Sequence, residues 1–346
     1  MHITACAGER ITINAGERNM NEADHAKAGR ARLVYDQFTA RSSKDDEYKD
    51  WTGYRRELTD FVMRTTPAGG SLLILGAGKC NDLDLRKLAD HCGAITLSDY
   101  RPETVEEAFA RYDLAPSDTL KTVASDYVGI TDEDYLEYTD RLITVMEKLA
   151  DCPDLEETAA PVESLEIAGF ELAKIAGPEL AALEETLEGI YRRNAAYTVD
   201  LGNRAYDNAV VAGVHSQLNN SFRGLFQYVR KDVEERKGEV PLANELNAAV
   251  FRMTGKHTGD LVDRFNEALF AAVREGVVYA YEECIIYTPE GAATPAIGTV
   301  DGARQAGEAI ADFPVKEKTS CLWPLSRRRK VKFEMTVCYL TVGEQQ

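Results

Sequence analysis

The chain has 346 residues, 44% of them hydrophobic, so it can bury a sizeable core as one elaborated domain or as two domains. Its 58 acidic and 40 basic residues give a formal net charge of −18, which disfavours contact with a phosphate backbone, and we expect no nucleic-acid partner. We find no apolar run that suits a signal peptide or a membrane span. A cytoplasmic protein without membrane contact is therefore expected.

The cysteines and histidines are scattered along the sequence. Seven cysteines and five histidines occur without a C-x-x-C pair or an H-E-x-x-H motif. This spacing indicates neither a disulfide framework nor a zinc site. We expect a reducing compartment and no metal.

The first 66 residues precede the predicted core. The opening thirty have no clear periodicity, whereas residues 31–65 carry apolar side chains at helical spacing. We interpret this part as a loose arm followed by a helical lid. Pro67 and two glycines then end the pattern, and the continuous apolar run SLLILG at 71–76 is typical of a strand buried on both faces.

Strands and helices alternate after this first strand. A glycine turn leads to a helix at about 81–91, the strand AITLSD at 94–99, a helix at 101–112 and a third strand at 120–127. Such a βαβ order predicts a parallel sheet.

An acidic helical pattern interrupts the alternation at residues 131–194. Up to residue 190 it holds seventeen Asp or Glu and three Lys or Arg, a local balance of −14. We predict an α-helical insertion between the third and fourth strands. The charge could attract a cationic substrate such as a basic peptide, but we favour the simpler interpretation that it forms the solvated face of amphipathic helices.

The alternation then resumes and ends in two strand-like runs separated only by SRRRK, which predicts an antiparallel hairpin. The predicted elements are a strand at 206–213, a helix at 261–276, a strand at 277–287, and the hairpin strands at 319–325 and 330–342. We predict an α/β fold with a doubly wound, seven-stranded, mostly parallel sheet. Its core would comprise residues 67–130 and 195–346.

A glycine turn and an aspartate indicate a nucleoside-binding site. Gly76 and Gly78 permit a sharp turn and close approach of a ligand at the carboxyl end of a strand. Asp99 ends the next strand, where a carboxylate can accept hydrogen bonds from ribose hydroxyls. A dinucleotide site would need Gly or Ala at position 81, so Asn81 counts against NAD.

With Asp126 after the third strand, this pattern resembles the class I S-adenosylmethionine-dependent methyltransferases, a Rossmann-like family. The resemblance covers about residues 31–342 apart from the insertion, and it implies S-adenosylmethionine as cofactor. Ile74 and Cys80 depart from the family pattern, which usually has an acidic residue and a third glycine there.

The resemblance also implies which residues surround the cofactor. The turn would approach the methionine part of the cofactor, and Asp99 would approach the ribose. Asp126 and Tyr127 would lie at the adenine edge. Asn81 or Asp82 would replace the missing polar contact, and Tyr35 is either a lid residue or a core residue packed against a helix. The predicted cofactor-binding residues are Gly76, Ala77, Gly78, Asn81, Asp99, Tyr100, Asp126, Tyr127, Gly213, Val214 and Tyr35.

The segment GVHSQL after the fourth strand bears on the methyl acceptor. A hydroxyl or ammonium acceptor needs a base, for which His215 is the candidate unless it is structural, whereas a carboxylate acceptor needs none. Gln217 and Tyr35 are candidate substrate contacts. Family members that methylate amides or adenine usually carry an Asp/Asn-Pro-Pro-aromatic motif here, and its absence favours oxygen.

We therefore expect O-methylation of a small molecule or peptide, such as a peptide carboxylate, in a tailoring pathway. Two alternatives stay open. An NAD-dependent oxidoreductase would share the glycine turn, and a catalytically inactive partner protein that binds the cofactor would share every motif. The sequence does not determine the oligomeric state.

Overall fold

The computed structural model describes residues 22–40, 46–152, 165–287, 292–295, 302–326 and 331–342. Three sequence-based predictions fall partly outside the described residues. These are the N-terminal arm up to residue 21, the middle of the insertion at 153–164 and the hairpin tip at 327–330.

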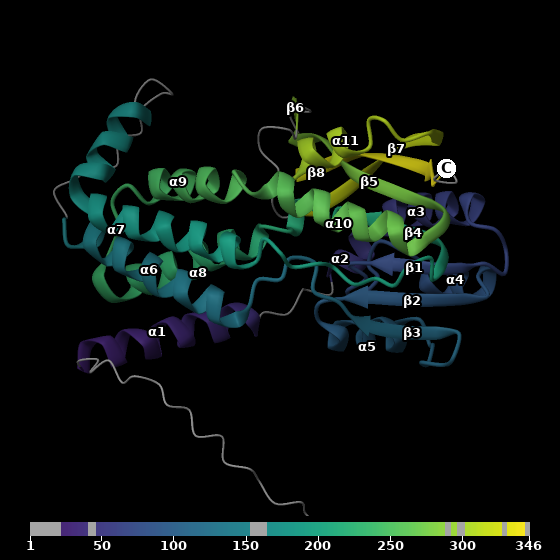
Figure 1. The fold of residues 1–346 in the computed structure, drawn as a ribbon, viewed down its shortest axis with the longest axis horizontal. Helices are drawn as coiled ribbons and strands as arrows, with labels where there is room; N and C mark the ends of the chain where they lie inside the picture. Colours follow the sequence, from purple (N-terminus) through teal and green to yellow (C-terminus); the bar gives the residue numbers. More distant parts are fainter. Residues whose placement is uncertain are drawn as a thin grey trace, which may run out of the picture.

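One sheet of mostly parallel strands forms the core, in the order β3-β2-β1-β4-β5-β8-β7 (Figure 1). Strand β8 is antiparallel to both of its neighbours, and the short β6 pairs with the end of β5. The predicted mostly parallel sheet with its terminal hairpin is confirmed, and β6 is one strand more than predicted. The strands are β1 (Ser71–Leu75), β2 (Ala94–Asp99), β3 (Leu120–Ala124), β4 (Tyr206–Ala212), β5 (Val273–Tyr287), β6 (Ala292–Pro295), β7 (Val315–Ser326) and β8 (Val331–Thr341).

Helices cover both faces of the sheet because β1 is apolar on both. Leu72 and Ile74 face the core shared with α3, α4 and α5, while Leu73 and Leu75 face the core shared with α10 and α11. This is the burial expected of a continuous apolar strand. The bounds of these helices, and of the short α2 before them, are α2 (Asp46–Asp50), α3 (Thr52–Thr65), α4 (Leu85–His91), α5 (Pro102–Arg111), α10 (Thr258–Ala272) and α11 (Ala303–Ala309).

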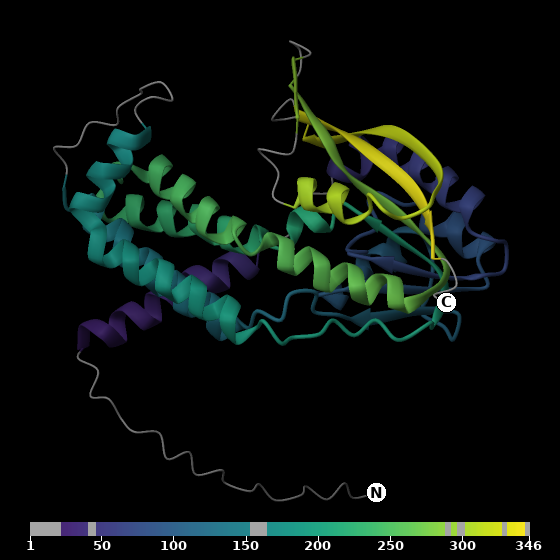
Figure 2. The same cartoon turned by 45° about the horizontal axis from the view of Figure 1, so that its top comes forward.

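A second group of helices extends beyond the carboxyl ends of the parallel strands (Figures 1 and 2). We call it the helical layer; it consists of α1 (Glu22–Thr39), α6 (Asp132–Ala150), α7 (Leu165–Arg193), α8 (Asn220–Lys237) and α9 (Ala243–Gly255). Leu142, Leu187 and Phe222 of this layer belong to the same buried cluster as Leu73 of the sheet. Within the described ranges, no helix is long and apolar enough to span a bilayer.

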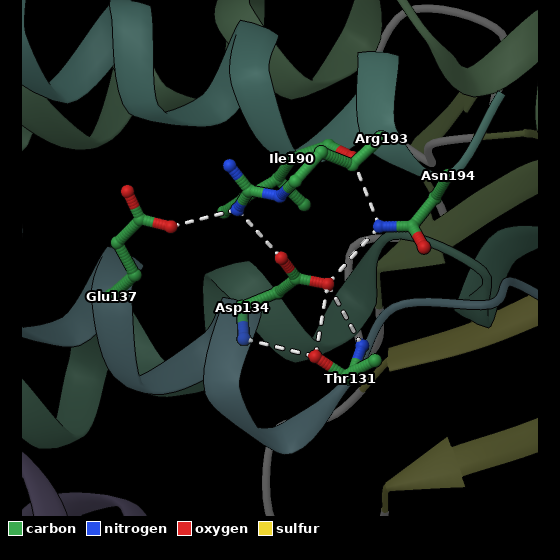
Figure 3. Close-up of polar contacts among 6 residues, drawn as sticks. All are labelled: Thr131, Asp134, Glu137, Ile190, Arg193 and Asn194. Carbon is green, nitrogen blue, oxygen red and sulfur yellow. Dashed lines mark hydrogen bonds and ion pairs between the residues drawn. The ribbon is translucent and has the colours of Figure 1, made fainter. Parts of the chain in front are cut away.

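Asp134 joins the beginning of α6 to the end of α7 (Figure 3). Thr131 and Asp134 form a capping box, in which Thr131 Oγ1 accepts from Asp134 N at 3.2 Å and Asp134 Oδ2 accepts from Thr131 N at 3.1 Å. Arg193 and Asn194 donate to the same carboxylate at 2.7 and 3.0 Å. Both ends of the insertion are thus held together.

Several predicted boundaries are wrong. The third strand, expected at 120–127, ends at Ala124, and the helix expected at about 81–91 begins at Leu85. The helix expected at 261–276 ends at Ala272, and β5 begins directly at Val273. Val273 pairs with Tyr206 of β4, so strand pairing takes over where the apolar pattern alone still allowed a helix.

Candidate functional site

The glycine turn follows β1, which lies between β2 and β4 at the point where the strand order reverses. Gly76 and Gly78 have φ of +63° and +45°, the left-handed region that favours glycine. A Cβ on Gly76 would lie 2.7 Å from Val214 Cγ2, so the segment after β4 packs directly on the turn. A Cβ on Gly78 would meet nothing closer than Asp99 Oδ2 at 3.9 Å, which leaves this side of the turn accessible to a ligand.

Asp99 connects the turn to the end of β2. Gly78 N donates to its Oδ2 at 2.8 Å, and Arg101 N donates to its Oδ1 at 2.9 Å. Burial raises the pKa of Asp99, and these two backbone donors partly oppose the shift. Because each carboxylate oxygen can accept two hydrogen bonds, both keep the capacity to accept a hydroxyl.

Tyr127 lies against the turn as well as after β3. Its hydroxyl accepts from Gly76 N at 3.1 Å and donates to Ser98 O at 2.9 Å. Its ring meets Phe265 edge-on at 5.2 Å. Burial raises the pKa of Tyr127, so the phenol is neutral under ordinary conditions.

Asp126 organises the loop that carries Tyr127. Its Oδ1 accepts from the backbone N of Val128 and of Gly129, each at 2.9 Å. Tyr197 donates to Asp126 O at 2.9 Å and packs so closely that a Cβ on Gly129 would lie 2.3 Å from its ring. The segment after α7 thereby supports the loop after β3.

Tyr35 reaches the same end of the sheet through a carboxylate. Its buried hydroxyl donates to Asp132 Oδ1 at 2.6 Å, and its ring stacks on Tyr135 at 6.2 Å. The exposed Tyr100, next to Asp99, has its pKa raised by partial burial and then by the nearby Asp132. The structure therefore brings both Tyr35 and Tyr100 to the side chain of Asp132. Tyr35 itself is a packed core residue.

His215 is enclosed in the core. Only 1% of it is exposed, its Nε2 lies 2.9 Å from Asn266 Oδ1, and its ring contacts Tyr279 and Phe265 at 4.5 and 5.2 Å. Burial lowers the pKa of His215 to about 4, so the ring is neutral near pH 7. Gln217, by contrast, is exposed and accepts a hydrogen bond from Asn220 at 2.7 Å. This environment favours a packing role for His215.

Polar residues after the glycine turn are held by arginines from two helices. Arg55 of α3 donates to Asn81 O at 2.9 Å, and Arg111 of α5 donates to Asn81 Oδ1 at 2.6 Å. Burial raises the pKa of Asp82 to about 6, and the charge of Arg55 opposes that shift together with nearby backbone donors. At the start of α4, the Asp84 carboxylate accepts from Lys87 N at 3.2 Å.

Glu282 was not recognised from the sequence. It lies on β5, only 2% exposed, and Ser216 Oγ donates to its Oε1 at 2.6 Å. A Cβ on Gly213 would lie 3.5 Å from both this oxygen and the Trp323 ring. Burial raises the pKa of Glu282. A glutamate within the apolar run VVYAYEECIIY was the available signal, because period-two alternation turns it inward.

The described parts of the chain hold no group of three or more His, Cys, Asp or Glu side chains arranged for a metal ion.

The sheet has seven main strands with β8 alone reversed, and the glycine turn stands at its switch point. This is the fold of the class I methyltransferases. No family model and no curated protein matches the sequence. The fold is assigned from the order and direction of the strands.

The similar solved structures have low sequence identity and include methyltransferases as well as the [4+2]-cyclase SpnF. The N-methyltransferase NodS from Bradyrhizobium japonicum WM9, in complex with S-adenosyl-L-homocysteine, is 12% identical with a TM-score of 0.37, over 89% of this chain and 97% of that one. The complex of the Haloferax volcanii Trm112 methyltransferase activator with a methyltransferase is 10% identical with a TM-score of 0.36. The match covers 91% of this chain and 99% of that one. Magnesium protoporphyrin IX methyltransferase (ChlM) from Synechocystis PCC 6803 with bound SAM is 9% identical with a TM-score of 0.30. The match covers 93% of this chain and 99% of that one.

Proposed function

We propose that the chain is an S-adenosylmethionine-dependent methyltransferase that methylates an oxygen atom of a small molecule or peptide in a tailoring pathway. The observation that carries the proposal is the 2.8 Å hydrogen bond from Gly78 N to Asp99, which joins the ends of β1 and β2. Ligands of open α/β sheets bind at this edge, beside the switch point.

The residues present fit the cofactor. S-adenosylmethionine supplies a methyl group activated on a sulfonium. The turn at 76–78 would hold its methionine part, with Asp82 in place of the acidic residue missing at position 74. Asp99 would hold the ribose, and the loop of Asp126 and Tyr127 would line the adenine side. Gly213 and Val214 would border the opposite side of the turn.

The start of α4 argues against a dinucleotide. A pyrophosphate binds where a helix presents free backbone N–H groups and a positive dipole end. Here the Asp84 carboxylate already accepts from Lys87 N, and Asp82 adds a second carboxyl group nearby. A pyrophosphate would therefore meet like charge, which leaves the oxidoreductase as the weaker alternative.

The acceptor atom is proposed to be oxygen because the segment 213–216 lacks the motif of amide- and adenine-methylating members. The helical layer lies beyond the carboxyl ends of the strands (Figure 2), where α1 and the helices of the insertion would enclose the acceptor. In-line transfer requires chiefly that nucleophile, methyl and sulfur be aligned.

Calorimetric titration tests the class. S-adenosylhomocysteine should bind the whole chain with a dissociation constant on the order of micromolar, and NAD should not bind. Asp99→Ala should abolish this binding, while Asp113→Ala, at an exposed position, should not change it. Binding of NAD in place of S-adenosylhomocysteine would make the oxidoreductase the primary hypothesis.

Mass spectrometry tests the acceptor atom. Product should gain the mass of one methylene group, on oxygen. Methylation on nitrogen would contradict the oxygen assignment. Cofactor binding without even slow background turnover would favour the inactive partner protein.

A further inference from the structure

An acidic and aromatic cluster lies next to the proposed cofactor site. We define it by Trp51, Tyr54, Ser216, Glu282 and Trp323. The Trp323 ring stacks on Tyr54 at 6.1 Å and meets Trp51 edge-on at 5.2 Å. Ser216 binds Glu282 at 2.6 Å. Residues from α3, the segment after β4, β5 and β7 thus converge on one place.

This cluster adjoins the glycine turn through two consecutive residues. Val214 contacts the turn, since its Cγ2 lies 2.7 Å from the position of a Cβ on Gly76. Gly213 contacts the cluster, because a Cβ there would lie 3.5 Å from Glu282 Oε1 and 3.5 Å from the Trp323 ring. A molecule bound against Glu282 would therefore be close to the part of the cofactor site that approaches the methionine.

Three buried polar atoms of the cluster have no hydrogen-bond partner among the described residues. They are Oε2 of Glu282 and Nε1 of Trp51 and Trp323. Buried polar atoms in folded proteins are nearly always paired. One acceptor and two donors in one cluster therefore point to a ligand that supplies the complementary groups.

A surface groove of about 450 Å³ borders the cluster at Tyr54. This volume is in the range of small-molecule sites. Three carboxylates and one lysine line the groove, which disfavours an anionic ligand. The charged lining residues are Asp50, Glu57, Glu334 and Lys332.

We propose that this cluster binds the methyl acceptor, and that the acceptor is an aromatic alcohol whose hydroxyl group faces Oε2 of Glu282. This inference rests on the proposed methyltransferase function. The aromatic rings suit a planar ring, and the unpartnered Oε2 suits a hydroxyl donor. A carboxylate acceptor does not suit this position, because an ionised carboxylate has no proton to donate to Oε2 of Glu282.

The chemistry requires a base at this position. Bound S-adenosylmethionine would supply the methyl group to the acceptor oxygen, and its sulfur would keep both electrons of the broken carbon–sulfur bond. The hydroxyl proton passes to Oε2 of Glu282 and leaves for solvent after product release. Glu282 serves here in place of His215, whose ring packs against Phe265 and Tyr279.

The chain itself provides a local reporter. Its only two tryptophans are Trp51 and Trp323, so tryptophan fluorescence reports on this cluster alone. The full chain, saturated with S-adenosylhomocysteine, is titrated with phenol, benzoate and benzylammonium up to their solubility limits. We expect a saturable change in tryptophan fluorescence with phenol and no such change with benzoate.

Two variants make the test specific. Glu282→Gln keeps the shape and an oxygen for Ser216, so it should weaken phenol binding about tenfold and allow benzoate to bind. Glu283→Gln is the matched control, because Glu283 is the next residue of β5 and binds Thr336 at 2.8 Å instead. It should behave as the unaltered chain does. Thermal unfolding and S-adenosylhomocysteine affinity check that both variants fold.

Several results would overturn the proposal. The proposal would be overturned if benzoate bound as tightly as phenol, if benzylammonium bound more tightly than phenol, or if no probe gave a saturable response. Each of these results is measured on the unaltered chain, so none depends on whether Glu282→Gln folds. Failure of S-adenosylhomocysteine to bind is a separate result, which overturns the proposed function itself.

Discussion

Burial decides the protonation state of the polar side chains around the site. His215 is neutral because its enclosed ring would lose hydration on charging, and its pKa falls to about 4. Burial acts on Asp82 in the opposite sense and raises its pKa to about 6, because here the charged form is the deprotonated one. The sites of proton transfer therefore depend on packing as much as on residue type.

His215→Gln tests this protonation state through stability. An unfolded histidine has a pKa near 6.5, so between about pH 7 and about pH 5 the unfolded chain binds a proton that the native chain does not. The unaltered protein should lose about 2 kcal/mol of unfolding free energy over this range relative to the variant. Urea unfolding of both proteins at the two pH values measures the difference. An equal change in both would show that His215 is charged in the native state.

The two glycines of the turn should respond differently to alanine. Gly76→Ala combines the strain of a positive φ with a 2.7 Å contact to Val214, whereas Gly78→Ala carries mainly the strain. We expect losses of about 3 kcal/mol and about 1 kcal/mol, respectively. Chemical denaturation measures both, and a larger loss for Gly78→Ala would contradict the packing of Val214 on the turn.

At the scale of elements, the start of α6 and the end of α7 share the carboxylate of Asp134 (Figure 3). Burial acts to raise the pKa of Asp134, but donors from Arg193, Thr131 and Asn194 outweigh it, and the pKa lies below its usual value. The residue that caps the start of α6 therefore also binds the end of α7.

Asp134→Ala should remove the capping box and the contact to α7 together. Because Arg193 is half-exposed, its ion pair is screened, and we expect a total loss of about 2 kcal/mol in unfolding free energy. Glu137→Ala, which removes only the exposed partner of Arg193, should cost less than about 0.5 kcal/mol. The contribution of Asp134 should disappear as the pH falls through its lowered native pKa. Equal losses for the two variants would contradict this role of the cap.

At the scale of the whole molecule, the helical layer is not a separate body. Leu142 and Leu187 belong to the same buried cluster as Leu73 and Ala209 of the sheet. A second cluster, on the other face, holds α3 and packs against Trp323. The sheet lies between the two clusters, so loss of either core exposes it.

We therefore expect one cooperative unfolding transition. Far-ultraviolet circular dichroism reports mainly on the helices, many of which lie in the helical layer, whereas tryptophan fluorescence reports on Trp51 and Trp323 at the other face. The two signals should give the same midpoint in urea. Loss of helical signal at lower urea would show that the layer unfolds independently of the sheet.

Local patterns predicted the sheet better than the site. The run at 71–76, the period-two strands and the glycine turn depend on neighbours in sequence, and the structure confirms the strands they predict. Glu282 could not be found in this way, because its neighbours Ser216 and Gly213 are far from it in sequence. The enclosure of His215 likewise depends on Asn266 and Tyr279, from α10 and β5.

By itself, the sequence determined the order of the seven main strands, the glycine turn and the acid at the end of β2, because these follow from hydrophobic period and backbone conformation. Only the tertiary structure decided that α8 and α9 join α1, α6 and α7 in one layer, that Tyr127 binds the turn, and that Glu282 lies next to Gly213. The reason is physical. Burial and hydrogen bonding between distant segments depend on how the elements pack, and a single sequence does not display those distances.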